Sequence, residues 1–87
     1  MTKRHKLEII KDILEIVQNN RKIKHTPLLR KSNLSSLRFK EYYTELLEKD
    51  LIKEIGTNRK ETILTNKGQR FLEKYITIVN FIKEFEL

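Results

Sequence analysis

With 87 residues and a formal net charge of +7, the chain predicts one small domain that attracts polyanions, of which nucleic acid is the commonest. It contains no cysteine, which excludes disulfide bridges, thiolate metal sites and cysteine nucleophiles. No apolar run approaches the ~18 residues of a membrane span and the N-terminus lacks a signal-peptide core, so we expect a cytoplasmic protein with no membrane partner.

The first predicted element is an amphipathic helix over residues 6–19, because its apolar residues recur at helical spacing. The stripe consists of Leu7, Ile10, Ile13, Leu14 and Val17, widened by Ile9 and Ile16. Residues 21–25 are too few for a helix and predict a brief strand.

A second, short helix is expected from Pro27 to about Ser32. Thr26 is a good N-cap, and proline at the first helical position loses no hydrogen bond. Asn33 tolerates the left-handed backbone conformation that ends a helix.

The third helix is expected to follow Ser35 or Ser36, either of which can cap it, and to reach about Lys49. Residues 33–35 join it to the second helix, and their number and chemistry are typical of a helix-turn-helix connection. One face of the third helix is predicted to be core, and it carries Phe39, Tyr42, Tyr43, Leu46 and Leu47.

A β-hairpin is predicted next, from strands over residues 51–55 and 61–64. Between them, residues 56–60 are rich in turn formers. Thr65 then caps a last helix that runs almost to the C-terminus. This order of elements is that of a winged helix-turn-helix, so the predicted fold is mainly α with a small β-hairpin (α+β) and an extended C-terminal helix.

The distribution of charge is the most informative feature. Residues 16–40 contain no acidic residue but seven basic ones, namely Arg21, Lys22, Lys24, Arg30, Lys31, Arg38 and Lys40. Phosphate binding requires lysines and arginines gathered on one surface, because each neutralised phosphate releases counterions. Further basic clusters are residues 3–6 and the hairpin tip. We interpret the run as a surface for duplex DNA; the alternative is a solvated surface whose charges keep the protein soluble.

The candidate DNA contacts lie on the helix-turn-helix and on the hairpin tip: Arg30, Lys31, Ser35, Ser36, Leu37, Arg38, Lys40, Asn58, Arg59 and Lys60. Recognition helices approach the major groove with their N-terminal residues, which suits a helix that is basic at its start and acidic further along. Arg38 can reach a guanine edge or a phosphate, and Leu37 can touch a thymine methyl or pack on a loop. Glu41 can accept from cytosine, although a local pair with Arg38 or Lys40 is favoured.

The last helix predicts a homodimer. Apolar residues spaced 4, 3, 4, 3 form a coiled-coil seam, and the apolar surface is wider than that of an ordinary amphipathic helix. The predicted interface consists of Phe71, Tyr75, Ile78, Val79, Ile82 and Phe85. Without a partner this surface would be an exposed apolar patch, unless the helix folds back onto a monomeric core. Ile9 and Ile16 of the first helix offer a second candidate dimer surface.

Several short motifs together resemble one family. The string K-S-N-L-S begins at Lys31, L-T-x-K-G-x-x-x-L begins at Leu64, and the chain opens with R-x-K-L-E-I-I-x-D-I-L. In this combination the chain resembles the small archaeal winged helix-turn-helix DNA-binding proteins over nearly its whole length.

The resemblance implies a winged helix over residues 1–65 that binds duplex DNA and a dimerisation helix over residues 66–87, forming one compact unit. It implies that the helix starting at Ser35 or Ser36 is the recognition helix and that residues 56–60 are the wing. It also implies a transcription regulator or a chromatin-like architectural protein, associated with the nucleoid. The chain departs from the family pattern at Ser36-Leu37, which leaves the DNA sequence preference open. It departs also at Asp50, where the family has glycine, although aspartate too tolerates a helix end.

Three other functions are protein binding, RNA binding and catalysis. A winged helix can instead bind an acidic protein partner, whereas RNA binding lacks a signature such as aromatic strand pairs. The chain lacks a phosphate-cradling glycine-rich loop, paired inward carboxylates and a histidine near a candidate serine nucleophile, so we expect no enzyme and no small-molecule substrate. His5 and His25 have no partners at metal-ligand spacing, and no metal or cofactor is expected.

Overall fold

The computed structural model describes residues 5–87, so Lys3 and Arg4 of the predicted N-terminal basic cluster lie outside the described residues. The elements follow one another as α1 (Lys6–Asn20), β1 (Lys22–Lys24), α2 (His25–Ser32), α3 (Ser36–Glu48), β2 (Ile52–Ile55), β3 (Glu61–Leu64) and α4 (Asn66–Glu84). This order confirms the predicted winged helix-turn-helix arrangement, mainly α with a small antiparallel sheet.

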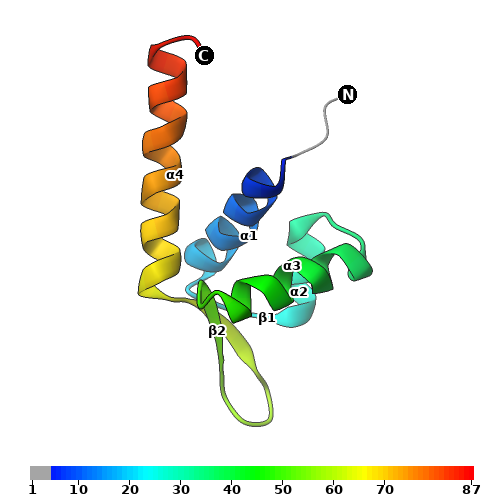
Figure 1. Ribbon diagram of the computed structural model, residues 1–87. Coiled ribbons are helices and arrows are strands. Elements are labelled where there is room, and N and C mark those ends of the chain that lie inside the picture. The colour runs from blue at the N-terminus through cyan, green and yellow to red at the C-terminus, as the bar shows by residue number, and fades with distance from the viewer. Residues whose placement is uncertain (1–4) are drawn as a thin grey trace.

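The sheet has three antiparallel strands in the order β1-β3-β2. β2 and β3 form the predicted hairpin, and β1 adds to the other edge of β3 with Ile23 opposite Thr62. The brief strand expected after the first helix therefore completes the sheet. In Figure 1 the hairpin projects from the body of the molecule at the end away from the free end of α4.

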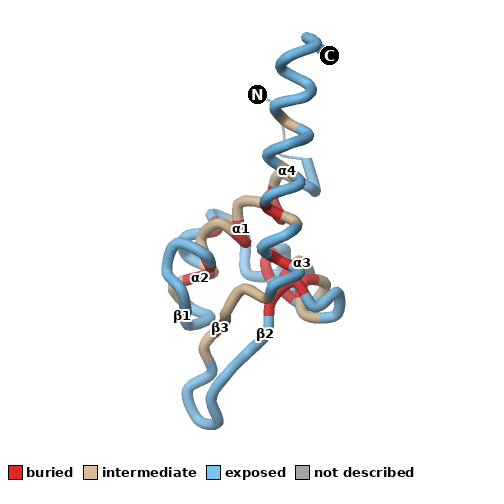
Figure 2. The backbone as a smooth tube through the Cα atoms, turned by 90° about the vertical axis from the view of Figure 1, so that its left-hand side faces the viewer, coloured by how far each residue is buried: buried red, intermediate tan, exposed pale blue. Residues whose placement is uncertain are grey.

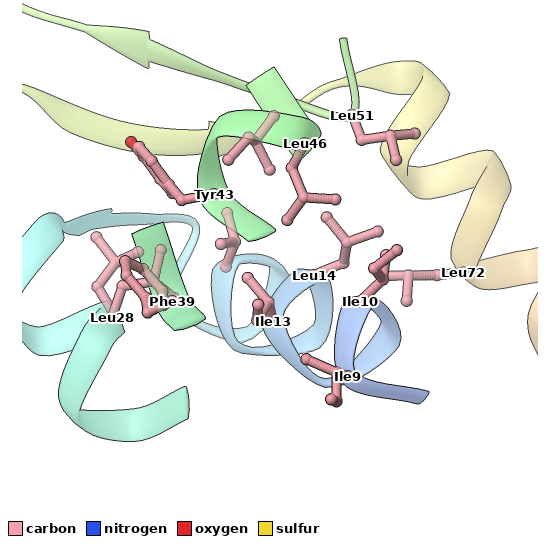
Figure 3. Close-up of a cluster of buried hydrophobic side chains, with 13 residues drawn as sticks. Ile9, Ile10, Ile13, Leu14, Leu28, Phe39, Tyr43, Leu46, Leu51 and Leu72 are labelled. Carbon is pink, nitrogen blue, oxygen red and sulfur yellow. The ribbon is translucent and has the colours of Figure 1, made fainter. Parts of the chain in front are cut away.

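The core lies between α1, the inner face of the sheet and the inward sides of α2, α3 and α4. α1 supplies most of it, through Ile9, Ile10, Ile13, Leu14 and Val17. Figure 3 shows the only labelled α4 side chain, Leu72, directed toward Ile10 and Leu14.

Two predictions about α1 were wrong. Leu7 is 57% exposed, because it lies in the first turn at the edge of the buried stripe. Ile9 was proposed as part of a second dimer surface, but it is 2% exposed because the protein's own core covers it.

α2 begins two residues earlier than expected. Its N-cap is Lys24, which makes no side-chain capping bond, so Thr26 is not the cap and Pro27 occupies the third helical position. The first turn of a helix has no intrahelical acceptors for its N–H groups, so proline is tolerated throughout that turn and not only at its first residue.

The turns around α3 have the predicted chemistry. Asn33 ends α2 in the left-handed conformation with φ 59°. Beyond α3, Asp50 has φ 60°, its N–H donates to the Leu47 carbonyl, and the N–H of Leu51 donates to the Leu46 carbonyl. These two bonds form a Schellman motif, so Asp50 takes the left-handed position that usually belongs to glycine.

α4 starts close against the sheet and ends far from it. Thr65 caps it by accepting from the N–H of Gly68 at 3.0 Å, as predicted for Thr65. Figure 2 shows buried and half-buried backbone near the start of α4 and mostly exposed backbone toward its end. No helix within residues 5–87 is both long enough and apolar enough to cross a membrane.

Candidate nucleic-acid interface

The start of α3 is held by a side-chain cap. The Ser35 hydroxyl accepts from the N–H of Arg38 at 3.3 Å, so Ser35 rather than Ser36 is the cap. A capped serine is already engaged with its own helix. Ser36 is therefore the serine with the freer hydroxyl at this end of α3.

The side chains that follow the cap point into solvent. Ser36, Leu37, Arg38 and Lys40 are all exposed, and Leu37 is 71% exposed. The guanidinium of Arg38 lies 6.0 Å from the centroid of the Tyr42 ring. The first two turns of α3 therefore present one large apolar side chain and two cations, with no acidic residue in the first turn.

Acidic side chains begin at Glu41. Among residues 5–87, Glu41 forms no ion pair with Arg38 or Lys40, so the predicted local pair is absent. Glu41 instead borders a shallow depression that Arg38 and Tyr42 also line. Glu41 therefore does not neutralise Arg38 or Lys40.

Glu45 is held by two lysines that the sequence reasoning missed. Lys6 of α1 and Lys49 each place Nζ 3.0 Å from its Oε2. Hydrogen bonds from Lys49 and Lys6 lower the pKa of Glu45. The four-residue spacing of Glu45 and Lys49 predicts the pair between them. The pair of Glu45 with Lys6 depends instead on how α1 packs against α3.

The remaining basic residues of the acid-free run lie on α2, on β1 and, in the case of Arg21, directly after α1. Arg30 and Lys31 are exposed in the last turn of α2, and Lys31 borders a depression shared with Asp12 and Glu15 of α1. Lys22 and Lys24 instead lie on β1, where Lys22 Nζ is 4.0 Å from Glu61 Oε1. These basic residues are neighbours in the sequence, but in the structure Lys22 lies on the sheet and Lys24 lies where the sheet meets the N-terminus of α2.

The wing is the loop that joins β2 to β3. Asn58, Arg59 and Lys60 are all exposed there. Gly56 has φ +96°, and a Cβ at this position would lie 2.9 Å from the Arg59 carbonyl oxygen. Glycine therefore allows the tight bend that presents the two cations at the tip.

A buried polar network joins α3 to the hairpin. The Tyr43 hydroxyl lies 2.6 Å from Thr62 Oγ1 and donates to Glu54 Oε2 at 2.8 Å. His25 packs edge-on against the rings of Phe39 and Tyr43. The sequence assigned Tyr43 to the core, but it offered no sign that the hydroxyl meets the hairpin.

The predicted dimer residues on α4 fall into two groups. Phe71, Tyr75 and Val79 are half-buried within the protomer, and Tyr75 lies beside Lys11 of α1, whose Nζ is 5.9 Å from the ring centroid. Ile78, Ile82 and Phe85 are exposed. Phe81 is exposed too and packs against Phe85, with their ring centroids 4.9 Å apart. An apolar surface remains uncovered on the far half of α4.

No group of histidine, aspartate and glutamate side chains within the described part of the chain could hold a metal ion. The two histidines have different surroundings. His25 lies against aromatic rings, and His5 is exposed just before α1.

Comparison with known proteins agrees with this architecture. The family model described as "Winged helix-turn-helix" matches residues 3–83. The crystal structure of Sso10a-2, described as a DNA-binding protein from Sulfolobus solfataricus, is similar with a TM-score of 0.73 and 22% identity, over 95% of this chain and 90% of that one. The crystal structure of SSV1 F-93 is similar with a TM-score of 0.70 and 25% identity, over 97% of each chain. No curated protein sequence matches significantly.

Proposed function

Because the chain belongs to the winged helix-turn-helix family, we propose that it binds double-stranded DNA as a homodimer, either as a transcription regulator or as an architectural protein. In this proposal α3 is the recognition helix and the loop of residues 56–60 is the wing. Family membership also supports the expectation that the chain is not an enzyme.

The observation that carries the proposal is the polarity of α3. Arg38 and Lys40 are exposed near its capped N-terminus, whereas Glu41, Glu45 and Glu48 follow toward its C-terminus. A helix that enters the major groove N-terminus first places the cations near phosphates and keeps the acids away from them. The same helix lying flat along a duplex would bring its acids against the backbone.

Contacts by the wing would add to this interface. Arg59 and Lys60 extend from the tip of a two-stranded hairpin that the Tyr43 network ties to α3. The description of Sso10a-2 as a DNA-binding protein is consistent with the proposal.

The homodimer is supported by the exposed half of α4. Ile78, Ile82 and Phe85 are 57%, 40% and 58% exposed, which leaves apolar area that a second copy can cover. A two-fold pair is the commonest closed assembly of identical chains. Two recognition helices in one dimer can then engage two half-sites.

Base readout and architectural binding make different use of the same surface. Leu37 and Arg38 are the exposed residues best suited to base edges, through a thymine methyl and a guanine. We assign the other exposed basic side chains to phosphates, which position the protein on the duplex. We therefore place any sequence preference on these two residues and the general affinity on the lysines, and we expect the protein to associate with the nucleoid.

The alternative is a module that uses the basic surface to bind an acidic protein. Titration of a fluorescent duplex with protein at several salt concentrations separates the two. For duplex DNA, log K falls linearly with log salt with a slope of about −0.9 per phosphate contacted. Failure to bind duplex even at low salt would favour the acidic protein partner.

A further inference from the structure

A second set of basic side chains lies away from the start of α3. It spans the outer face of the sheet and the first turns of α4, and we call it the sheet–helix basic surface. Its members are Lys22, Lys53, Lys67, Arg70 and Lys74.

The strand members share one face of the sheet. Lys22, Ile63 and Lys53 are register partners across the three strands, so their side chains leave the sheet on the same side. The opposite side carries Ile23 and Thr62, which are buried in the core. Lys22 and Lys53 therefore point outward, about 10 Å apart across β3.

The helix members form a stripe on α4. Lys67, Arg70 and Lys74 are spaced 3 and 4 residues apart, which places them on one side of the helix over about 10 Å. Lys53, Ile63, Lys67 and Arg70 line one open depression where the sheet meets α4. Lys74 borders a neighbouring depression with Lys67 and Arg70, and Lys22 lies across β3 from Lys53 on the same face of the sheet.

These cations have few internal partners. Within residues 5–87, no ion pair involves Lys53, Lys67, Arg70 or Lys74, and Lys22 has only the 4.0 Å contact with Glu61. The other acids near these cations are Asp50, at the edge of the depression, and Glu73, between Arg70 and Lys74 on α4. The surface therefore has an excess of unpaired positive charge.

The surface is separated from the start of α3 by negative charge. α3 has 13 residues, which is about 20 Å at 1.5 Å per residue. Glu41, Glu48 and Asp50 are exposed along the way from Arg38 to β2, and the exposed base among them, Lys49, is paired with Glu45. A straight duplex segment seated at the N-terminus of α3 would have to pass these acids to reach Lys53.

We propose that the sheet–helix basic surface binds the phosphate backbone of a second duplex segment while α3 holds the first. The inference rests on the proposed DNA binding by α3. Duplex DNA is the occupant that fits, because these cations are spread over about 10 Å in two directions and DNA carries a charge per ~1.7 Å of axis. Each protomer then holds two duplex segments.

The test counts duplexes per protomer. The full chain is titrated at low salt with a fluorescent duplex too short to hold two half-sites, and the stoichiometry is measured by sedimentation velocity. We expect two duplexes per protomer for the wild type and one for Lys67→Gln/Arg70→Gln.

Two further variants show which surface holds which duplex. Lys83→Gln removes a cation from the other end of α4 and should keep both duplexes. Arg38→Gln/Lys40→Gln should lose the duplex at α3 and keep the one at the sheet–helix basic surface. Circular dichroism melting confirms that each variant is folded.

The outcomes are distinct. A wild type that saturates at one duplex per protomer, or a Lys67→Gln/Arg70→Gln variant that still holds two, overturns the inference. A change in the oligomeric state of that variant also overturns it, because the surface would then meet a second copy of the chain. If Arg38→Gln/Lys40→Gln leaves all binding intact, the proposed role of α3 fails instead.

Discussion

The hydroxyl of Tyr43 in α3 lies 2.6 Å from Oγ1 of Thr62 in β3, and the two side chains are 6% and 1% exposed. Tyr43 also donates to Glu54 of β2, so Thr62 donates to Tyr43. Figure 3 shows the Tyr43 oxygen directed away from the cluster of core side chains. One hydroxyl thus links the proposed recognition helix to both strands of the wing hairpin.

Tyr43→Phe should destabilise the fold. The change leaves the Thr62 hydroxyl buried without its acceptor, which costs about 1–3 kcal/mol of unfolding free energy. Urea denaturation measures the loss. Tyr42→Phe is the matched control, because Tyr42 is half-buried on the same helix, and it should lose much less unfolding free energy. Equal losses in the two variants would contradict the stabilising role of the Tyr43 hydrogen bonds.

The same hydroxyl predicts a pH dependence. Burial raises the pKa of Tyr43 to about 12, and Glu54 adds to this whereas the bond from Thr62 opposes it. A raised folded-state pKa contributes stability that is present below the unfolded value of about 10 and is lost as pH rises through the folded value. The stability difference between wild type and Tyr43→Phe should therefore shrink between about pH 10 and 12. A constant difference over that range would show that Tyr43 does not titrate as its burial requires.

Gly68→Ala tests how α4 meets the sheet. A Cβ at Gly68 would collide with the Leu51 carbonyl oxygen and crowd Leu64 Cδ1. That carbonyl already accepts from the N–H of Thr65, so it cannot withdraw freely. We expect a loss of about 1–3 kcal/mol, as is typical of overpacking. Thermal melting measures this loss of stability, and Gln69→Ala, at an exposed position, should leave the stability nearly unchanged. A Gly68→Ala variant as stable as the wild type would contradict the close approach of Gly68 to Leu51.

Replacing Ile78 and Ile82 by lysine tests the dimer. Both side chains are exposed, so the protomer should stay folded while the two new charges disfavour burial in an interface. We expect a monomer by sedimentation equilibrium, where the wild type is a dimer. Thr77→Lys/Asn80→Lys adds the same charge on another side of α4 and should remain dimeric. A dimeric Ile78→Lys/Ile82→Lys variant would place the interface elsewhere.

Local chemistry predicted most of the fold. Asn33, Thr65 and Asp50 act within a few residues of their own position, and their turns and caps have the predicted form. Helical periodicity likewise placed Phe39 and Leu46 in the core. Contacts between distant elements were not predictable, because they depend on how elements pack; the Tyr43–Thr62 bond and the pairing of β1 with β3 are examples.

The candidate site shows the same division. The exposure of Leu37, Arg38 and Lys40 follows from their helical positions and agrees with the sequence prediction. The placement of Lys22 on β1 and Arg38 on α3 was not predictable from the acid-free run. Proximity along the chain does not show on which face of a sheet a strand residue lies. The half-burial of Tyr75 beside α1 could not be predicted from the sequence either. An apolar stripe on a helix can face its own domain or a partner, and the spacing of its residues is the same in both cases.

The most direct test of the central claim is the affinity for a fluorescent duplex, measured against salt, for wild type, Arg38→Ala/Lys40→Ala and Lys83→Ala. If the start of α3 meets DNA, Arg38→Ala/Lys40→Ala should bind more weakly, with a slope of log K against log salt smaller by about two, and Lys83→Ala should bind like the wild type. Equal affinities and slopes for all three proteins would contradict the account.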